Sequence, residues 1–174
     1  MYLVDIIAGA RPNFMKIAPI IHAIKNSKSE RSMLSYRLIH TGQHYDKKMS
    51  RDFFDQLSIP RPDLNLEVGS GSQAEQSGAM MIGYEKAIIN KRPDMCLVVG
   101  DVTSTMACAI TAQKLKVPVA HVEAGIRSND WSMPEEINRI LADRVSSLLF
   151  CPTTTAVNNL HKEGIYDGVN IVGD

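Results

Sequence analysis

The sequence predicts an α/β protein with a Rossmann-like open parallel sheet and helices on both faces. Short apolar runs rich in β-branched residues alternate with segments of helical periodicity along the chain. These runs are apolar throughout, as in parallel strands that are buried on both faces. Polar and charged residues collect directly after the runs, at the edge of the sheet where such folds bind ligands.

The first part of the chain contains three of the expected strands. Tyr2–Ala8 is a nearly continuous apolar strand, and Pro12 suits the first turn of the helix that follows. That helix has an apolar face at 3.6-residue spacing, formed by Phe14, Ile17, Ala18, Ile21 and Ile24. Next come a strand at Met33–Ile39, a helix at Lys47–Leu57, and a short strand at Leu64–Glu67 within a loose surface loop.

The remaining elements continue the alternation of helices and strands. The helix expected at Gln73–Asn90 places Met81, Tyr84 and Ile88 on one side. A buried strand at Met95–Val99 leads to a helix at Ser104–Leu115 and a strand at Val117–Val122. In the helix at Pro134–Val145, the inward residues are expected to be Ile137, Ile140, Leu141 and Val145. A strand at Leu148–Cys151, a helix at Thr153–Lys162 and a strand at Val169–Val172 follow.

Composition excludes several classes of protein. The 174 residues are 44% hydrophobic and 22% charged, which is typical of one globular domain and not of a disordered chain. Nineteen basic and nineteen acidic residues give no net charge, which argues against nucleic-acid binding and against a polybasic membrane surface. The sequence has no apolar run of transmembrane length, and Asp5 interrupts the N-terminal apolar stretch, which argues against a signal peptide. Three cysteines without CxxC spacing predict buried, reduced thiols in a cytoplasmic protein.

The end of the first strand suggests an anion site. The chain there reads Gly9-Ala10-Arg11-Pro12-Asn13, with Lys16 one turn into the helix. It matches neither a dinucleotide fingerprint nor a phosphate-binding P-loop. A glycine turn that enters a helix N-terminus still favours anions, and Arg11 and Lys16 would supply positive charge suited to a diphosphate. The alternative is that Arg11 pairs with a nearby carboxylate and Lys16 is solvated.

Carboxylates follow the later strands. Asp101 and Glu123 come directly after neighbouring strands, where two acids can divide the work of a general acid and a general base. Glu135, in the first turn of a helix, could project a third carboxylate toward them. The alternatives are that Asp101 caps a helix and that Glu135 stabilises a helix N-terminus, with a surface pair to Arg139 at i+4.

Histidines raise the question of a metal. His40 and His44 with the two strand-end acids would be a plausible ligand set, but their spacing spans a loop and not a helix. No metal site is therefore predicted. His121 lies within a strand, and we expect it to be a hydrogen-bonded core residue.

Taken together, the motifs resemble the non-hydrolysing UDP-N-acetylglucosamine 2-epimerase family. The resemblance extends in order through nearly the whole chain and is specific because eight motifs are involved. They are GARPNFMKIAP (Gly9–Pro19), TGQH (Thr41–His44), PDLNL (Pro62–Leu66), GDVTST (Gly100–Thr105), PVAHVEAGIRS (Pro118–Ser128), PEEINR (Pro134–Arg139), CPT (Cys151–Thr153) and NLHKEG (Asn159–Gly164).

The resemblance implies a GT-B-like enzyme of two domains, of which residues 1–174 match the N-terminal Rossmann-like half. The C-terminal nucleotide-binding domain would be absent from this chain, and the half-enzyme is expected to be inactive alone. The implied reaction interconverts UDP-GlcNAc and UDP-ManNAc without a cofactor, through elimination and re-addition of UDP. Implied partners are UDP-GlcNAc and UDP, the missing domain, and a second subunit in a full-length homodimer.

The resemblance also assigns roles to particular residues. Its catalytic carboxylates match Asp101, Glu123 and Glu135. The residues that match substrate-binding positions are Arg11, Lys16, Gln43, His44 and Arg139. Gln43 also matches part of an activating site in some bacterial members, from which Asp46 and Gly69–Ser72 depart. Other readings are a GT-B glycosyltransferase and a non-catalytic nucleotide-binding module.

Overall fold

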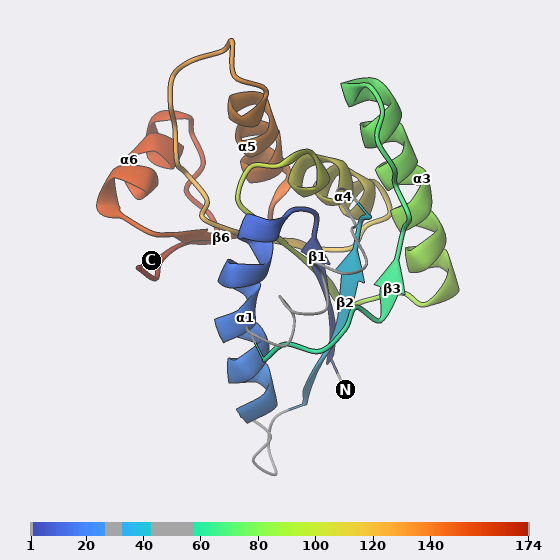
Figure 1. Ribbon diagram of the computed structural model, residues 1–174. Coiled ribbons are helices and arrows are strands. Elements are labelled where there is room, and N and C mark those ends of the chain that lie inside the picture. Colours follow the sequence, from blue (N-terminus) through green and yellow to red (C-terminus); the bar gives the residue numbers. More distant parts are fainter. Residues whose placement is uncertain (1, 27–32, 43–57, 174) are drawn as a thin grey trace.

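The computed structural model describes residues 2–26, 33–42 and 58–173. Within these ranges, seven parallel strands form one sheet in the order β3-β2-β1-β4-β5-β6-β7 (Figure 1). The strands are β1 (Tyr2–Ala8), β2 (Leu34–His40), β3 (Leu64–Asn65), β4 (Met95–Val99), β5 (Val119–Val122), β6 (Leu148–Cys151) and β7 (Val169–Ile171). The helices are α1 (Arg11–Asn26), α3 (Gln73–Asn90), α4 (Thr103–Lys114), α5 (Pro134–Val145) and α6 (Thr154–Lys162).

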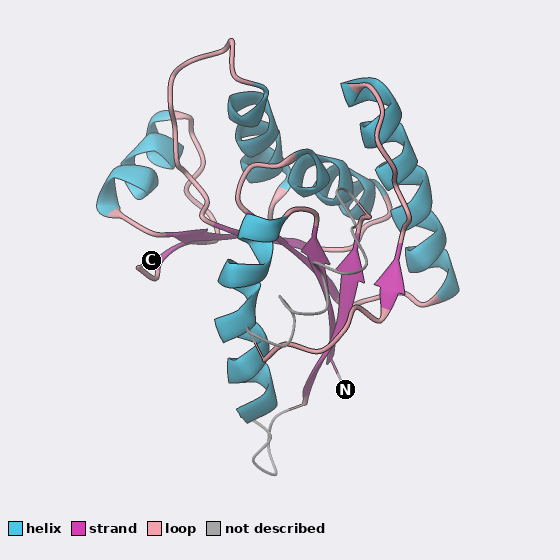
Figure 2. Cartoon of the chain, in the orientation of Figure 1, coloured by secondary structure: helices cyan, strands magenta, loops and turns pink. Residues whose placement is uncertain are grey.

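Helices cover both faces of the sheet (Figure 2). On one face, α1 buries Phe14, Ile17 and Ile21 against the strands. On the other face, α3 and α4 pack over β1, β4 and β5, with Tyr84 and Cys108 fully buried among the strand residues. Helix α6 covers β6 through Leu160 and Ala156. The α/β class, the parallel sheet and the two helical layers are therefore as the sequence predicts.

The direction of strand addition reverses between β1 and β4, where open α/β sheets form a ligand-binding crevice. Asn13 ties the two strand ends together. Its Oδ1 accepts hydrogen bonds from the backbone N–H groups of Gly9 (3.1 Å) and Ala10 (2.9 Å). Its Nδ2 donates to the carbonyl oxygen of Val99 at 3.0 Å. The hydrogen bonds of Asn13 therefore join the carboxyl ends of β1 and β4 within the protein itself.

The predicted inner face of α5 is partly wrong: Val145 packs against the core and Ile140 is half-buried, but the other two residues are exposed. Ile137 and Leu141 of α5 are 42% and 37% exposed, whereas the buried positions are Glu136, Asn138, Arg139, Ala142 and Asp143. The reason is that α5 packs against α4 and against the polar loops at the carboxyl edge, and less against the sheet. Its inner face therefore meets loop backbone, which needs polar partners. On α3, Met80 and not Met81 is the fully buried methionine.

Other predictions can be placed more briefly. The three cysteines are free and buried. The predicted helix Lys47–Leu57 lies outside the described residues. In the part of the chain that the structure describes, no helix has the length and apolar character needed to span a bilayer.

Candidate active site

Asp101 lies at the carboxyl end of β4, held by two residues of α5. Its carboxylate forms an ion pair with the Arg139 guanidinium, and its carbonyl oxygen accepts a hydrogen bond from Asn138 Nδ2 at 2.9 Å. The side chain of Arg139 is only 10% exposed, and its Nη1 donates to Glu136 Oε2 at 2.8 Å. Helix α4 begins after Val102 with no side-chain cap, so Asp101 does not cap the helix. The site therefore holds one cation between two acids.

Glu123 lies at the end of the neighbouring strand β5 and has a left-handed backbone, with φ at +68°. This conformation costs a non-glycine residue energy and is a recognised mark of functional positions. Its carboxylate forms an ion pair with Lys16 of α1. A Cβ built on Gly100 would lie 3.4 Å from Glu123 Oε2, so the acid rests against the turn that leads to Asp101. The two strand-end acids therefore share one region.

Glu135 lies in the first turn of α5 and is exposed. The surface pair with Arg139, considered as an alternative role for Glu135, is absent from the described residues, because Arg139 is instead bound by Asp101 and Glu136. Residues four apart project from the same side of a helix. Glu135 therefore lies one helical turn before Arg139, whose guanidinium contacts Asp101. Asp101 and Glu123 lie at the carboxyl edge of the sheet, and Glu135 lies at the start of the helix that follows β5.

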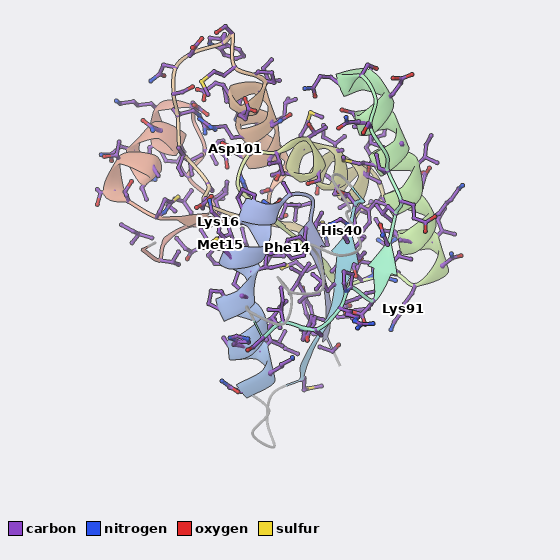
Figure 3. The ribbon with its side chains drawn as sticks, in the orientation of Figure 1. Phe14, Met15, Lys16, His40, Lys91 and Asp101 are labelled. Carbon is purple, nitrogen blue, oxygen red and sulfur yellow. The ribbon has the colours of Figure 1, made fainter. Side chains whose placement is uncertain are left out.

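Two hollows meet at Glu123 and Pro152. One, of about 410 Å³, lies beside α1 and is lined by Met15, Lys16 and Phe150 among others. The other, of about 340 Å³, lies against the start of α6. Volumes of this order suit a small-molecule ligand. In Figure 3, Met15, Lys16 and Asp101 lie on the left of the view, and Lys91 lies on the right.

The glycine turn after β1 differs from the predicted anion site. The N–H groups of Gly9 and Ala10 both donate to Asn13 Oδ1, so they are already paired. Positive charge near the turn comes from Lys16, which is paired with Glu123 and so not simply solvated. The side chain of Arg11 is outside the description, as are Gln43 and His44.

His40 is part of the core beside this edge. Its Nδ1 accepts a hydrogen bond from the N–H of Gly42 at 2.8 Å, and its ring stacks on Phe14 with centroids 5.4 Å apart. Burial lowers the pKa of His40, which agrees with a neutral ring whose Nδ1 is an acceptor. Among residues 2–26, 33–42 and 58–173, no three His, Cys, Asp or Glu side chains are grouped so as to hold a metal ion.

Sequence reasoning missed Glu136. This residue is 1% exposed, and its carboxylate accepts hydrogen bonds from the N–H groups of Ser128 and Asn129, both at 3.0 Å. Burial opposes its charge, but these bonds and the Arg139 charge prevail and lower the pKa of Glu136. Glu136 is the third residue of its helix, a position from which acids bind backbone N–H groups that precede the helix. This position was the signal available in the sequence. His121, by contrast, is the buried hydrogen-bonded histidine that was predicted.

Comparison with known proteins matches most of the chain. A family model described as UDP-N-acetylglucosamine 2-epimerase matches residues 26–174. A protein of Methanococcus maripaludis named UDP-N-acetylglucosamine 2-epimerase homolog is 50% identical over 168 residues, which cover 97% of this chain and 45% of that protein. The UDP-2,3-diacetamido-2,3-dideoxy-D-glucuronate 2-epimerase of Pseudomonas aeruginosa is 49% identical over 158 residues, covering 91% and 44%.

A solved structure agrees with the fold. The crystal structure of Methanocaldococcus jannaschii UDP-GlcNAc 2-epimerase in complex with UDP-GlcNAc and UDP superposes with a TM-score of 0.91 at 46% identity. The superposition covers 100% of this chain and 47% of that one. The chain spans about half the length of the curated relatives it matches.

Proposed function

The chain belongs to the UDP-N-acetylglucosamine 2-epimerase family, and on that premise we propose that the full-length protein interconverts UDP-GlcNAc and UDP-ManNAc without hydrolysis. The observation that carries the proposal is the pair of cation–carboxylate contacts at adjacent strand ends. Lys16 binds Glu123, and Arg139 binds Asp101. Such an arrangement supplies groups that move protons and charges that stabilise a leaving diphosphate.

The chemistry explains why acids and cations are both needed. The C2 proton of the sugar is not beside a carbonyl, so it is not acidic in the resting substrate. Cleavage of the C1–O bond sends its electron pair to UDP and builds positive charge at C1. A carboxylate then removes the C2 proton, giving 2-acetamidoglucal with a C1–C2 double bond. Protonation of C2 from the opposite face and attack of UDP oxygen on C1 complete the inversion.

We assign the proton transfers to Asp101, Glu123 and Glu135. Asp101 and Glu123 end neighbouring strands and flank Gly100, as groups on two sides of one sugar ring would. Glu135 is exposed in the first turn of α5, where a bound sugar can reach it. The left-handed backbone of Glu123 supports this assignment, because strain of this kind persists where function maintains it.

We propose that residues 1–174 are the N-terminal half of a GT-B-like enzyme and that a C-terminal domain binds most of the nucleotide. The curated relatives are about twice as long, which supports this organisation. The two hollows beside Glu123 are open grooves, which suits a site completed by a second domain. The 174-residue chain alone is therefore expected to show no turnover.

The test uses the full-length protein with UDP-GlcNAc in D₂O, followed by NMR. We expect UDP-ManNAc and deuterium at C2, with UDP and 2-acetamidoglucal as intermediates. The variants Asp101→Asn, Glu123→Gln and Glu135→Gln should each lose at least ~10²-fold in rate, the scale of lost acid–base catalysis. Near-normal rates in all three would contradict the site assignment. Sugar transfer to an acceptor without exchange at C2 would indicate a glycosyltransferase instead.

One observation favours a second candidate for the substrate. The Pseudomonas aeruginosa relative, at 49% identity, is named for a diacetamido uronic acid and not for UDP-GlcNAc. Its reaction is also an inversion at C2, so the same carboxylates would suffice. Competition between the two nucleotide sugars in the NMR assay distinguishes the candidates by the ratio of their kcat/KM values.

A further inference from the structure

A buried histidine–aspartate pair lies between the turns that carry the strand-end acids. His121 of β5 and Asp143 of α5 both have fully buried side chains. The Nδ1 of His121 is 2.6 Å from Asp143 Oδ1, and its Nε2 is 2.7 Å from the carbonyl oxygen of Gly100. The other oxygen of Asp143 accepts a hydrogen bond from the N–H of Gly125 at 3.0 Å. The pair therefore connects the turn after β4 with the turn after β5.

Both turns contain left-handed backbone, and at Glu123 this backbone is strained. Gly100, Glu123 and Gly125 have φ values of +70°, +68° and +77°, so three residues near the acids are left-handed. A Cβ on Gly125 would lie 2.3 Å from the carbonyl oxygen of Ala156, which shows how closely the second turn approaches α6. Glycine adopts this conformation without strain, but a non-glycine residue such as Glu123 keeps it only where surrounding contacts over-determine it.

Asp143 is itself held from a second side. Arg127 donates from Nη1 to Asp143 Oδ2 at 2.7 Å and pairs through Nε and Nη2 with Glu163 at 2.7 and 2.8 Å. The Arg127 side chain is 4% exposed, so the guanidinium is fixed between two acids.

We propose that His121 and Asp143 are positioning residues that fix the two turns against each other and so set the separation of Asp101 and Glu123. This inference rests on the proposed epimerase function and adds the residues that align its acids. Neither side chain reaches the grooves, so their effect on the reaction passes through backbone. A displacement of about 1 Å at a reacting group can cost ~10²-fold in rate.

The test compares three variants of the full-length enzyme. Asp143→Leu replaces the carboxylate with an apolar side chain of similar size and so removes the bonds to His121, Gly125 and Arg127. Its kcat should fall by about 10²-fold. Its KM should stay within about threefold, because loss of a group that acts only in the transition state lowers kcat and not substrate binding. Asp143→Asn should retain most of kcat, since an amide nitrogen donates to Nδ1 and the ring keeps its Nε2 proton for Gly100. The control is the double variant Asp5→Leu with Arg37→Met, which removes another fully buried ion-paired aspartate together with its partner and should keep its kcat.

Crystal structures of the same variants give a readout that does not depend on activity. In Asp143→Leu, the backbone at Asp101 and Glu123 should shift apart relative to the wild type, and in Asp143→Asn it should not. If Asp143→Leu does not fold, His121→Gln breaks one link only and should show a smaller shift and an intermediate kcat. Unchanged geometry with wild-type kcat in the leucine variant, or equal losses in the leucine and asparagine variants, would overturn the proposal. An inactive wild type would instead contradict the proposed function, while the structures still decide the positioning role.

Discussion

Two buried ionic networks occupy opposite parts of the same sheet and differ in how completely their groups are paired. In the first, Arg37 of β2 binds Asp5 of β1 with two parallel hydrogen bonds of 2.8 and 2.7 Å. Tyr84 of α3 donates to the same carboxylate at 3.2 Å, and Arg37 also donates to the carbonyl oxygen of Lys91 at 3.0 Å. Strands and a helix end hold every member of this network in place.

The second network, Asp101–Arg139–Glu136, is less complete. It lies among loops at the carboxyl edge, and the Asp101 side chain is 36% exposed. Arg139 Nε is buried and has no hydrogen-bond partner among the described residues. The backbone of nearby Glu123 is left-handed. This sheet therefore has one network that serves stability, and it keeps unsatisfied and strained groups at the edge where we propose that the substrate binds.

The largest expected effect is on the stability network. Asp5→Ala leaves the Arg37 guanidinium buried without its carboxylate, which should lower the free energy of unfolding by about 3–5 kcal/mol. Urea unfolding measures this loss. The double variant Asp5→Leu with Arg37→Met removes both charges and should recover at least half of it, because an apolar pair replaces a buried ion pair at little cost. A double variant as unstable as the single one would contradict the comparison.

The next effect separates stability from activity at one residue. Glu123→Gly should reduce the epimerase rate by at least ~10²-fold, yet its stability should be unchanged or higher by up to about 1 kcal/mol, because glycine adopts the left-handed backbone without strain. The same substitution at Glu135 provides the control, since that residue is helical. Glu135→Gly should lower stability by about 0.5–1 kcal/mol. Urea unfolding of both variants would refute the strain argument if their stabilities change in the same direction.

A smaller expected effect is on the stability of the protein at acidic pH. The pKa of Glu136 is lowered in the folded protein, so its ionised form stabilises the fold above the unfolded pKa, and this stability is lost as pH falls through the folded pKa. As pH rises through the acidic range toward the ordinary pKa of a glutamate, the stability of the wild type should therefore increase more steeply than that of Glu136→Gln. Unfolding free energies measured across this range test the sign. Parallel curves would show that the loop contacts of Glu136 do not depend on its charge.

The fold could be predicted closely from the sequence because its strands are marked by continuous apolar runs. The bounds expected for Tyr2–Ala8, Met95–Val99 and Leu148–Cys151 are those observed. Parallel strands end at one edge of the sheet, and this geometry correctly predicted that Asp101 and Glu123 lie at that edge. These inferences need only local patterns and the geometry common to parallel sheets.

The contacts within the site could not be predicted in the same way. Periodicity assumes that a helix turns its apolar side to the core, but α5 turns Glu136 and Arg139 inward because loop backbone lies beneath it. The i+4 spacing likewise suggested a surface pair of Glu135 with Arg139 as an alternative, whereas Arg139 pairs with Asp101 and Glu136. The closure of the Gly9 turn by Asn13 depends on a side-chain rotamer and on the neighbouring strand, which no spacing in the sequence reports.

The smallest effect is a difference in thiol labelling between the two parts of the sheet. Burial raises the pKa of Cys96 to about 12 and that of Cys151 to about 11, so neither should react measurably at pH 8 while the fold is closed. Cys96 packs beside Tyr84 in the stability network, whereas Cys151 ends β6 directly before Pro152, which lines both hollows. If strained loops lower local stability at the carboxyl edge, Cys151 should be labelled a few times faster than Cys96 in native protein. Mass spectrometry of the modified peptides measures the two rates. Equal rates would mean that both networks open only when the whole protein unfolds. The two networks would then differ in their chemistry and not in their local stability.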